Sequence, residues 1–477
     1  MRPYIRFVLG GVTLLATLTS FIAQAQVRIE IPASNIINGS EFSTTRTVMN
    51  TGNYDSWRSQ QTNPTIWSVS NMFTHKTIAG SNLPSSILHW QLDNIGGNRP
   101  KYHQHDVLPD FQWFSTSSKI WYEIHNPNAS SFTAGNVVFK FKIPAAAFAT
   151  NIFVPGEYKL TINHNYGGYF TPSSFDVIIV IPSTSASSIN WVSNNTIVNH
   201  TISNLNIYRE ITGGQIPIGQ TKISNTVKFN LWGKTTSAIQ FISSKAVQST
   251  VSPVFVKLES SNSSKISKLP LSQENWTNYT PNGPFAVVPG NQNTFDLNFS
   301  ISNLDLKNHF FEAGTYTFQL ELDAKSPDNA HSAKQLTDVT LVVPALSELI
   351  IAPSKQEVNF QFNSATHYQQ GQSKVISTQI KLSNNENYEL YVKSAASFFN
   401  KGGVQSNINS TILEVGVDGI STVALSTTPQ KIISAGAPVL DQEFDIKYLI
   451  SPSAAQSLIE KEKTTYSINV IYSFTAL

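Results

Sequence analysis

Apolar and polar side chains alternate over much of this chain, most clearly in residues 295–344. The first run there has the period of two that is typical of a half-buried β-strand. A second run begins at Tyr316 and a third ends at Pro344. The apolar positions of the first run are Phe295, Leu297, Phe299 and Ile301. The pattern predicts three consecutive strands, the second of which starts at a tyrosine.

The same arrangement occurs twice more along the chain. In the N-terminal part, NVVFKFKI and GEYKLTIN match it without a gap, so that Tyr158 corresponds to Tyr316. In the C-terminal part, FDIKYLI and TTYSINVIY match it with one residue inserted before Tyr466. Internal repeats indicate related structural units. We therefore predict three related domains.

Short alternating strands separated by polar turns favour β-sandwiches. The expected fold is all-β, with three immunoglobulin-like β-sandwich domains in series after a signal peptide. Each Gly-x-Tyr or Thr-x-Tyr strand start resembles the tyrosine corner of immunoglobulin-like domains, whose hydroxyl bonds to upstream backbone. The polar run STSASS (183–188) marks a domain boundary. The predicted domains are residues 26–182, 183–345 and 346–477.

The third copy of the module is shorter than the other two. Closing strands are predicted at 175–181 and 337–343, but no matching residues follow Tyr466 before Leu477. We expect the third sandwich to lack its last strand, which would leave unpaired edges and an exposed apolar face. A strand from another chain could complete it. The predicted assembly strand carries Tyr466, Ile468, Val470, Tyr472 and Phe474.

Two other segments carry expectations of their own. Residues 27–31 alternate and predict an N-terminal strand-like arm, which we expect to belong to its own sandwich rather than to be free. Residues 453–462 are the best helix candidate in the mature chain, with Ser453 as the expected N-cap.

The composition indicates an exported protein. Arg2 and Arg6, an apolar stretch and Ala23-Gln24-Ala25 predict a signal peptide over residues 1–25 and a secreted or cell-surface location. Without those two arginines, 30 basic residues balance 30 acidic ones, so no nucleic-acid partner is expected. No later stretch is apolar enough to span a membrane. The absence of cysteine excludes disulfides and thiolate sites.

Aromatic side chains are concentrated in the first predicted domain, which holds five of the eight tryptophans. Exposed Trp and Tyr present flat apolar faces that stack on sugar rings or anchor a protein partner. Trp57, Tyr102 and Trp113 are the candidate ligand-binding residues, because their neighbours have loop or edge-strand composition. Ordinary core packing is the alternative for each. Leu88, Trp90 and Leu92 share one strand face and are expected in the core.

No catalytic motif is recognisable, so we expect no enzyme activity and no cofactor. His103 and His105 would share a face of a strand and could bind a divalent cation, but no third ligand is apparent, so a solvated loop is favoured. Residues 323–331 (DAKSPDNAH) contain acidic residues that calcium could use, and a plain turn is favoured there. No metal site is predicted.

The alternating strand TTYSINVIYSFTAL after an aromatic-rich first domain resembles chaperone–usher fimbrial subunits and their multidomain tip adhesins. The resemblance covers residues 346–477 directly. It departs from many such subunits because the chain has three domains and lacks a cysteine pair. It implies export through the periplasm, a periplasmic chaperone and an usher, assembly with other fimbrial subunits through the third domain, and a glycan or protein receptor bound by the first.

Three functions remain open from the sequence. The first is a non-enzymatic surface or fimbrial adhesin that assembles by strand exchange. The second is a carbohydrate-binding protein that works alone. The third is a hydrolase whose site is not recognisable from its motifs.

Overall fold

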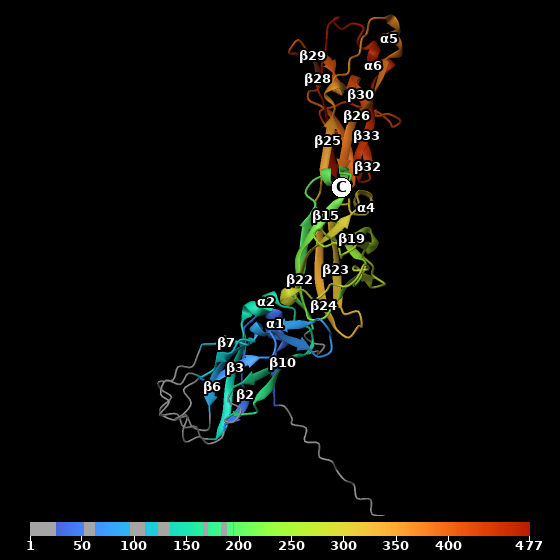
Figure 1. Ribbon diagram of the computed structural model, residues 1–477. Coiled ribbons are helices and arrows are strands. Elements are labelled where there is room, and N and C mark those ends of the chain that lie inside the picture. The colour runs from blue at the N-terminus through green and yellow to red at the C-terminus, as the bar shows by residue number, and fades with distance from the viewer. Residues whose placement is uncertain are drawn as a thin grey trace, which may run out of the picture. The chain divides into compact units, whose positions relative to one another are not determined.

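The computed structural model describes residues 25–51, 63–95, 110–122, 134–165, 170–182, 188–193 and 195–477, and within them the fold is all-β, as predicted (Figure 1). The chain divides into two compact units. One comprises residues 1–190 with the short segments 224–227 and 286–293, and the other comprises the rest. The domain boundaries predicted at residues 183 and 346 stay a prediction.

The first unit contains two sheets, which we call the first sandwich. One sheet has the order β1-β12-β10-β3-β8, with β4 paired to β10 and to β5. Its strands are β1 (Gln26–Glu30), β12 (Ser174–Ile181), β10 (Gly156–His164), β3 (Thr65–Ser68), β8 (Lys119–Ile120), β4 (Met72–His75) and β5 (Asn82–Pro84). The other has the order β11-β2-β9-β6-β7. Its strands are β11 (Phe170–Thr171), β2 (Phe42–Thr51), β9 (Gly135–Ile143), β6 (His89–Ile95) and β7 (Gln112–Trp113). Two short helices are α1 (Ala33–Asn38) and α2 (Ala145–Thr150).

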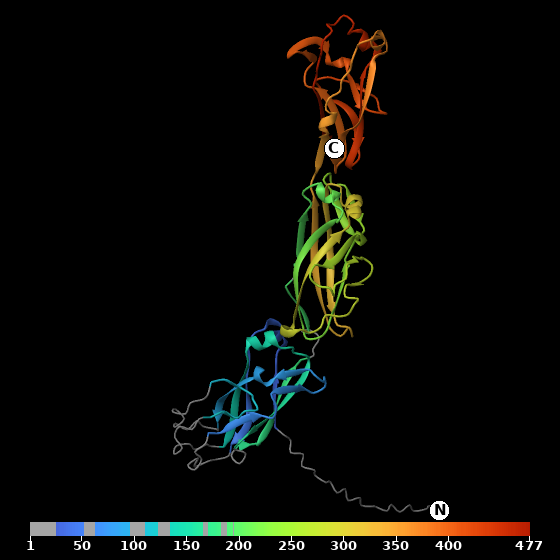
Figure 2. The same cartoon turned by 45° about the horizontal axis from the view of Figure 1, so that its top comes forward.

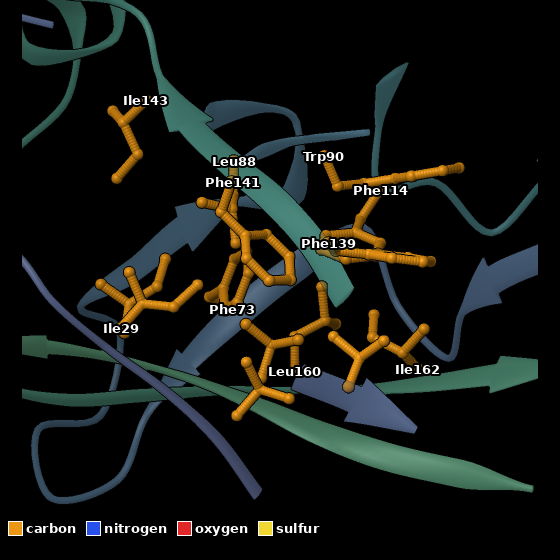
Figure 3. Close-up of a cluster of buried hydrophobic side chains, with 14 of the residues drawn as sticks. Ile29, Phe73, Leu88, Trp90, Phe114, Phe139, Phe141, Ile143, Leu160 and Ile162 are labelled. Carbon is orange, nitrogen blue, oxygen red and sulfur yellow. The ribbon is translucent and has the colours of Figure 1, made fainter. Parts of the chain in front are cut away.

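The core of the first sandwich is continuous between its two sheets. Aromatic rings from β6 and β9 face aliphatic side chains from β10 (Figure 3). Trp90 stacks on Phe139, with ring centroids 5.5 Å apart. The predicted core positions Leu88, Trp90 and Leu92 are buried. The alternating pattern therefore identified the inward face correctly.

The N-terminal arm is a strand of its own sandwich, as expected. β1 pairs in parallel with β12 over five residues, from Gln26 opposite Asp176 to Glu30 opposite Val180. Val27, Ile29 and Ile31 are buried in the core.

The second unit contains two further pairs of sheets (Figure 2). The second sandwich consists of two sheets. Their strand orders are β13-β15-β22-β19-β20 and β14-β24-β23-β16-β21, and in the latter sheet β17 pairs with β23 and β18. The strands of the first sheet are β13 (Ile189–Ser193), β15 (Gly214–Asn225), β22 (Gln292–Ile301), β19 (Val256–Ser260) and β20 (Leu269–Pro270). Those of the second are β14 (Ile197–Thr201), β24 (Ser332–Val343), β23 (Gly314–Lys325), β16 (Asn230–Thr235), β21 (Thr277–Asn278), β17 (Ile239–Ser243) and β18 (Gln248–Val251). Its helices are α3 (Asn206–Arg209) and α4 (Asn303–His309).

The third sandwich consists of the sheets β25-β26-β33-β30-β31 and β32-β27-β34, with a separate β28-β29 pair. The strands of the first sheet are β25 (Ser347–Ile351), β26 (Gln372–Asn384), β33 (Val439–Ile450), β30 (Glu414–Val417) and β31 (Val423–Ala424). The others are β32 (Gln430–Gly436), β27 (Tyr388–Ser394), β34 (Val470–Ala476), β28 (Phe398–Lys401) and β29 (Val404–Asn409). Its helices are α5 (Ala365–Gln370) and α6 (Pro452–Gln456).

All three repeats carry the predicted tyrosine corner. The hydroxyl of each tyrosine donates a hydrogen bond to the carbonyl oxygen four residues upstream. The pairs are Tyr158 with Val154 (3.1 Å), Tyr316 with Glu312 (3.2 Å) and Tyr466 with Glu462 (3.1 Å). The repeat recognised in the sequence therefore recurs as the same local structure.

The predicted helix at 453–462 is wrong in its extent and in its cap. α6 ends at Gln456, and the Ser451 hydroxyl, not that of Ser453, accepts from the Ala454 amide. Pro452 occupies the first turn, where its missing N–H group costs nothing. The Ser457 hydroxyl then bonds to the Ala454 carbonyl oxygen at 2.6 Å, and such a local bond competes with helix continuation.

The acidic segment at 323–331 comprises the end of β23 and the turn that leads to β24. Ser326 and Asp328 bond to each other there, and the Asp328 carboxylate accepts the Ala330 amide (3.0 Å). Both bonds stabilise the carboxylate and lower the pKa of Asp328. The favoured interpretation as a plain turn fits this geometry.

Candidate functional site

The tyrosine strands of the first two sandwiches have partners on both edges. β10 lies between β12 on one side and β3 and β4 on the other. β12 lies in turn between β10 and the parallel strand β1. In the second sandwich, β23, β24 and β14 repeat this arrangement. A closing strand thus fits between the tyrosine strand and a parallel N-terminal strand.

The matching strand of the third sandwich has only one partner in the described part of the chain. β34 pairs antiparallel with β27, from Val470 opposite Ser394 to Ala476 opposite Tyr388. No described strand pairs with its other edge. The alternate N–H and C=O groups of β34 on that side are left unpaired, which is the geometry that accepts an added strand.

An extended segment, residues 357–362, corresponds to the parallel strand of the other sandwiches. The second sandwich has the order β13, β14, α3, β15, and the third has β25, this segment, α5 and β26. Val358, Phe360 and Phe362 pack against the core, while Glu357, Asn359 and Gln361 are exposed. No strand pairing of residues 357–362 occurs within the described residues. The segment has the side-chain alternation of a strand without its backbone partner.

Burial of the inward residues separates the third sandwich from the others. On β10 and β23, the inward residues Tyr158, Leu160, Ile162, Tyr316, Leu320 and Leu322 are buried, whereas Phe318 is half-buried. The corresponding residues of the third sandwich are half-buried. They are Tyr466, Ile468, Val470, Tyr472 and Phe474, the predicted assembly residues. We use the term open edge for three features together. These are this half-buried row, the unpaired side of β34 and residues 357–362.

The assembly strand is shorter than predicted. β34 begins at Val470, whereas Tyr466 and Ile468 precede it. The reason is that β27 ends at Ser394, so the ladder has no further partner residue there. The preceding chain instead forms a bridge from Ser467 to Asn400. The role of all five residues in assembly stays a prediction.

Two tyrosine hydroxyl groups meet at the open edge. Tyr448 Oη and Tyr472 Oη lie 2.7 Å apart, and burial raises the pKa of both phenols. The second sandwich has Phe299 and Leu322 at the matching positions, both buried. The third sandwich therefore places a polar pair where its relative has apolar contact.

Of the three candidate ligand-binding residues, the structure describes Trp113. Its side chain is 44% exposed on the edge strand β7, opposite His89 of β6. The Lys119 ammonium lies 4.8 Å from the centre of the Trp113 ring. Burial, and then the charge of Lys142, lower the pKa of His89, so this imidazole is neutral at pH 7. Trp57 and Tyr102 lie outside the described residues.

Within the described part of the chain, no three His, Cys, Asp or Glu side chains are placed to hold a metal ion. His103 and His105 lie outside the described residues. Among those residues, too, no helix is long and apolar enough to cross a membrane.

No protein-family model matches the chain, and a sequence comparison with characterised proteins finds no match. Its structure is similar to CfaE, the adhesive subunit of the CFA/I fimbria of enterotoxigenic Escherichia coli, with 11% identity and a TM-score of 0.26, covering 67% of this chain and 98% of CfaE. It is also similar to a chain of the CsuC–CsuE chaperone–tip adhesion subunit complex of Acinetobacter baumannii, with 12% identity and a TM-score of 0.27. That match covers 59% of this chain and 99% of the other. The match to the CooA pilin subunit of enterotoxigenic E. coli has 14% identity and a TM-score of 0.24, and covers 33% of this chain and 98% of CooA. Because these TM-scores are low, the proposals below rest on the geometry of the chain itself.

Two features of the site were not recognisable from sequence. Residues 357–362 are a strand by pattern, but only the sandwich places them beside the open edge. The lysines of this edge come from β8 and β9, which belong to different sheets, and the packing of the sandwich brings them together. The outward positions of Lys140 and Lys142 in the alternating run NVVFKFKI were the one available signal.

Proposed function

We propose that this chain is a secreted, non-enzymatic surface subunit of a fimbrial type, whose third sandwich accepts a strand from another subunit at the open edge. The first sandwich then binds the receptor. This function places the mature protein at the cell surface after export through the periplasm, where a chaperone and an usher would handle the open edge before assembly.

The observation that carries the proposal is the half-buried row on β34. Of the equivalent inward residues on β10 and β23, where a closing strand is present, all but Phe318 are buried. A strand inserted between β34 and residues 357–362 would bury this row and pair the free backbone groups. Each apolar side chain that such a strand buries contributes about 1.5–3 kcal/mol. Three to five of them would be comparable with the stability of a whole domain.

The N-terminal arm supports a position at one end of an assembly. Its three apolar residues are buried in the first sandwich, and β1 is paired with β12 along its length. A strand committed to its own core is not free to enter a second subunit. We therefore infer that the chain receives a strand but does not donate this one.

Receptor binding is proposed for the exposed aromatic edge of the first sandwich. Trp113 is the described residue that combines an exposed ring with an edge strand. An indole ring in this position offers an apolar face and an N–H donor, which suits a sugar ring or a protein side chain. Trp57 and Tyr102 remain candidates for the same role.

The chain's own closing strand supplies the test peptide. In the second sandwich, Leu341 lies opposite Tyr316, Val339 opposite Phe318 and Thr337 opposite Leu320. A peptide of residues 333–343 should therefore present the same side chains to Tyr466, Ile468 and Val470. Added at about one hundred times its dissociation constant, it should stabilise the third sandwich by about 2.7 kcal/mol. Thermal unfolding of the chain from Gln26 onward measures the shift.

A matched peptide with Asp at the positions of Val339 and Leu341 is the control, since a charge entering the core has no partner. Stabilisation by the first peptide and not by the second supports assembly. Equal behaviour of the two peptides, with a monomeric and stable chain, would contradict it. That result would favour the second function, a carbohydrate-binding protein that works alone. Glycan cleavage abolished by a single carboxylate change would instead identify a hydrolase.

A further inference from the structure

The outward face of the sheet around Trp113 is built from cross-strand rows. Trp113 lies opposite His89, and His89 lies opposite Lys142 of β9. In the next row, Gln91 lies opposite Lys140. Directly paired residues point to the same side of a sheet, and their sequence neighbours point to the other. The neighbouring Trp90 and Phe141 are accordingly buried in the core. Two lysines therefore share the face of Trp113.

Lysine ammonium groups lie against both aromatic rings of this edge. Besides Lys119 over Trp113, Lys142 lies 4.6 Å and Lys140 5.9 Å from the centre of the Phe111 ring. Ring faces carry partial negative charge, which holds the ammonium groups beside them. We call Phe111, Trp113, Lys119, Lys140 and Lys142 the lysine–aromatic face.

One carboxylate lies close to a lysine of this face. Glu41 lies 3.7 Å from Lys142. Asp93 and Asp110 are exposed nearby in the sequence of β6 and before β7. Within the described residues, neither Lys119 nor Lys140 has an ion-pair partner within 4.0 Å. Two cationic groups therefore remain available beside the exposed Trp113 ring and the half-buried Phe111 ring.

The second sandwich shows the same motif in a neutralised form. Lys234 and Lys334 lie 5.1 and 5.2 Å from the centre of the Trp276 ring. Both lysines also pair with one carboxylate, Glu321, at 3.8 and 2.9 Å. There the protein supplies the anion. At the lysine–aromatic face the corresponding anion for Lys119 and Lys140 is missing from the described residues.

We propose that the lysine–aromatic face binds an acidic glycan, with a sugar ring packed on Trp113 and the carboxylate of that sugar or its neighbour paired with Lys119 or Lys140. This inference rests on the proposed receptor-binding role of the first sandwich and names its ligand class. The mature chain carries balanced charge and the face offers few cations. A saccharide with isolated carboxylates fits that charge, whereas a densely sulfated polyanion calls for a large basic patch.

The test uses the chain from Gln26 onward with 3′-sialyllactose, lactose and a heparin tetrasaccharide as probes in isothermal titration calorimetry. A glycan array carrying sialylated and uronic-acid saccharides widens the set of acidic ligands. The acidic probe should bind about tenfold more tightly than lactose. The preference should weaken as salt is raised, because the ion pairs are exposed. The double variant Lys119→Gln/Lys140→Gln should reduce binding to the lactose level, and Trp113→Ala should abolish both.

The matched control is Lys334→Gln, which removes a lysine over a tryptophan in the second sandwich and should leave binding unchanged. Equal affinity for lactose and sialyllactose, or tighter binding of heparin, would overturn the ligand class while leaving receptor binding in place. No binding to any acidic glycan on the array would overturn the site itself. Neither result touches strand acceptance by the third sandwich, which the peptide experiment tests separately. Unchanged unfolding of each variant shows that the fold persists.

Discussion

The first and third sandwiches build the same tyrosine strand and bury it to different depths. In the first, Leu160 and Ile162 are buried between two sheets, and β12 and β1 cover the far edge. In the third, Ile468 and Val470 occupy the matching inward positions and are half-buried. The two strands have the same alternation and the same tyrosine corner. They differ in the neighbour that each edge meets.

This contrast shows that the burial of a strand's inward side chains depends on the strands beside it. An inward side chain is covered both by the neighbouring strands of its own sheet and by the sheet opposite. When one neighbour is absent, the inward residues still point toward the core but remain accessible. Within the described residues, one edge of the third sandwich thus has no strand partner, and its inward side chains are half-buried.

The largest difference is expected from truncating matching inward residues. Ile162→Ala should cost about 2–5 kcal/mol, because truncating a buried isoleucine leaves a cavity. Val470→Ala should cost about 1 kcal/mol or less, because solvent already reaches this side chain. Urea denaturation combined with hydrogen exchange at β10 and β34 assigns each loss to its own sandwich, since a chain of several domains need not unfold in one step.

Equal losses at the two positions would break the comparison. Repeating the Val470→Ala measurement with the peptide of residues 333–343 sharpens it. The cost should then rise toward that of Ile162→Ala, because the added strand buries the side chain.

A smaller difference is expected at the tyrosine corners. The Tyr158 hydroxyl donates to the Val154 carbonyl oxygen and accepts the Val154 amide at 3.0 Å. Tyr158→Phe should cost about 1–2 kcal/mol, because it leaves buried backbone groups unpaired. Tyr466→Phe should cost less than about 0.5 kcal/mol, because water reaches its corner. Thermal unfolding of the two variants gives the ratio, and a larger loss for Tyr466→Phe would contradict the open edge.

A pH effect should mark the closed edge of the first sandwich. Hydrogen bonds from Arg28 of β1 and then from Lys76 lower the pKa of Glu157 to about 2 from its ordinary value of 4.5. A carboxyl group with a lowered pKa in the folded state contributes stability that is complete above pH 4.5 and is lost as the pH falls from 4.5 toward 2. Solvent reaches the pair, so the contribution should be about 1 kcal/mol or less.

Glu157→Gln should flatten the stability of the first sandwich across that pH range and leave stability at pH 2 nearly unchanged. Urea denaturation at pH 6, 4 and 2 measures it. An undiminished acid dependence in the variant would show that other carboxyl groups hold this edge.

The smallest effect is expected from converting the tyrosine pair to its apolar counterpart. In Tyr448→Phe/Tyr472→Leu both hydroxyl groups leave together, as in the second sandwich with Phe299 and Leu322. The change in unfolding free energy should lie within about 1 kcal/mol of zero, because replacing both partners of a hydrogen bond leaves neither unsatisfied. Tyr472→Leu alone should cost more, because the buried Tyr448 hydroxyl loses that partner. A double variant worse than the single one would indicate that the pair shapes the open edge.

Much of the fold was predictable because β-strand alternation is local. The inward faces of β9, β10 and β22 follow from a period of two, which holds whatever the partner strand is. The tyrosine corner was recognisable for the same reason, since its hydrogen bond spans four residues. The cap of α6 was predicted wrongly because Ser451 and Ser453 are equivalent by residue type, and Pro452 decides between them through its position in the first turn.

The candidate sites depended more on long-range pairing. The aromatic content of the first domain pointed to Trp113 but not to the lysines around it, because β6, β7 and β9 are separated in sequence and meet only in the sheet. Residues 357–362 have the alternation of a strand, but the sandwich leaves them without a backbone partner among the described residues.

The sequence by itself determined which residues form strands, which side chains of each strand face inward and that one structural module recurs three times, since all of these follow from short-range patterns along one chain. Only the tertiary structure decided how deeply each inward face is buried, which edges find a partner and which charges meet an aromatic ring. Those properties depend on contacts between residues that are distant in the sequence, and no local pattern specifies such contacts.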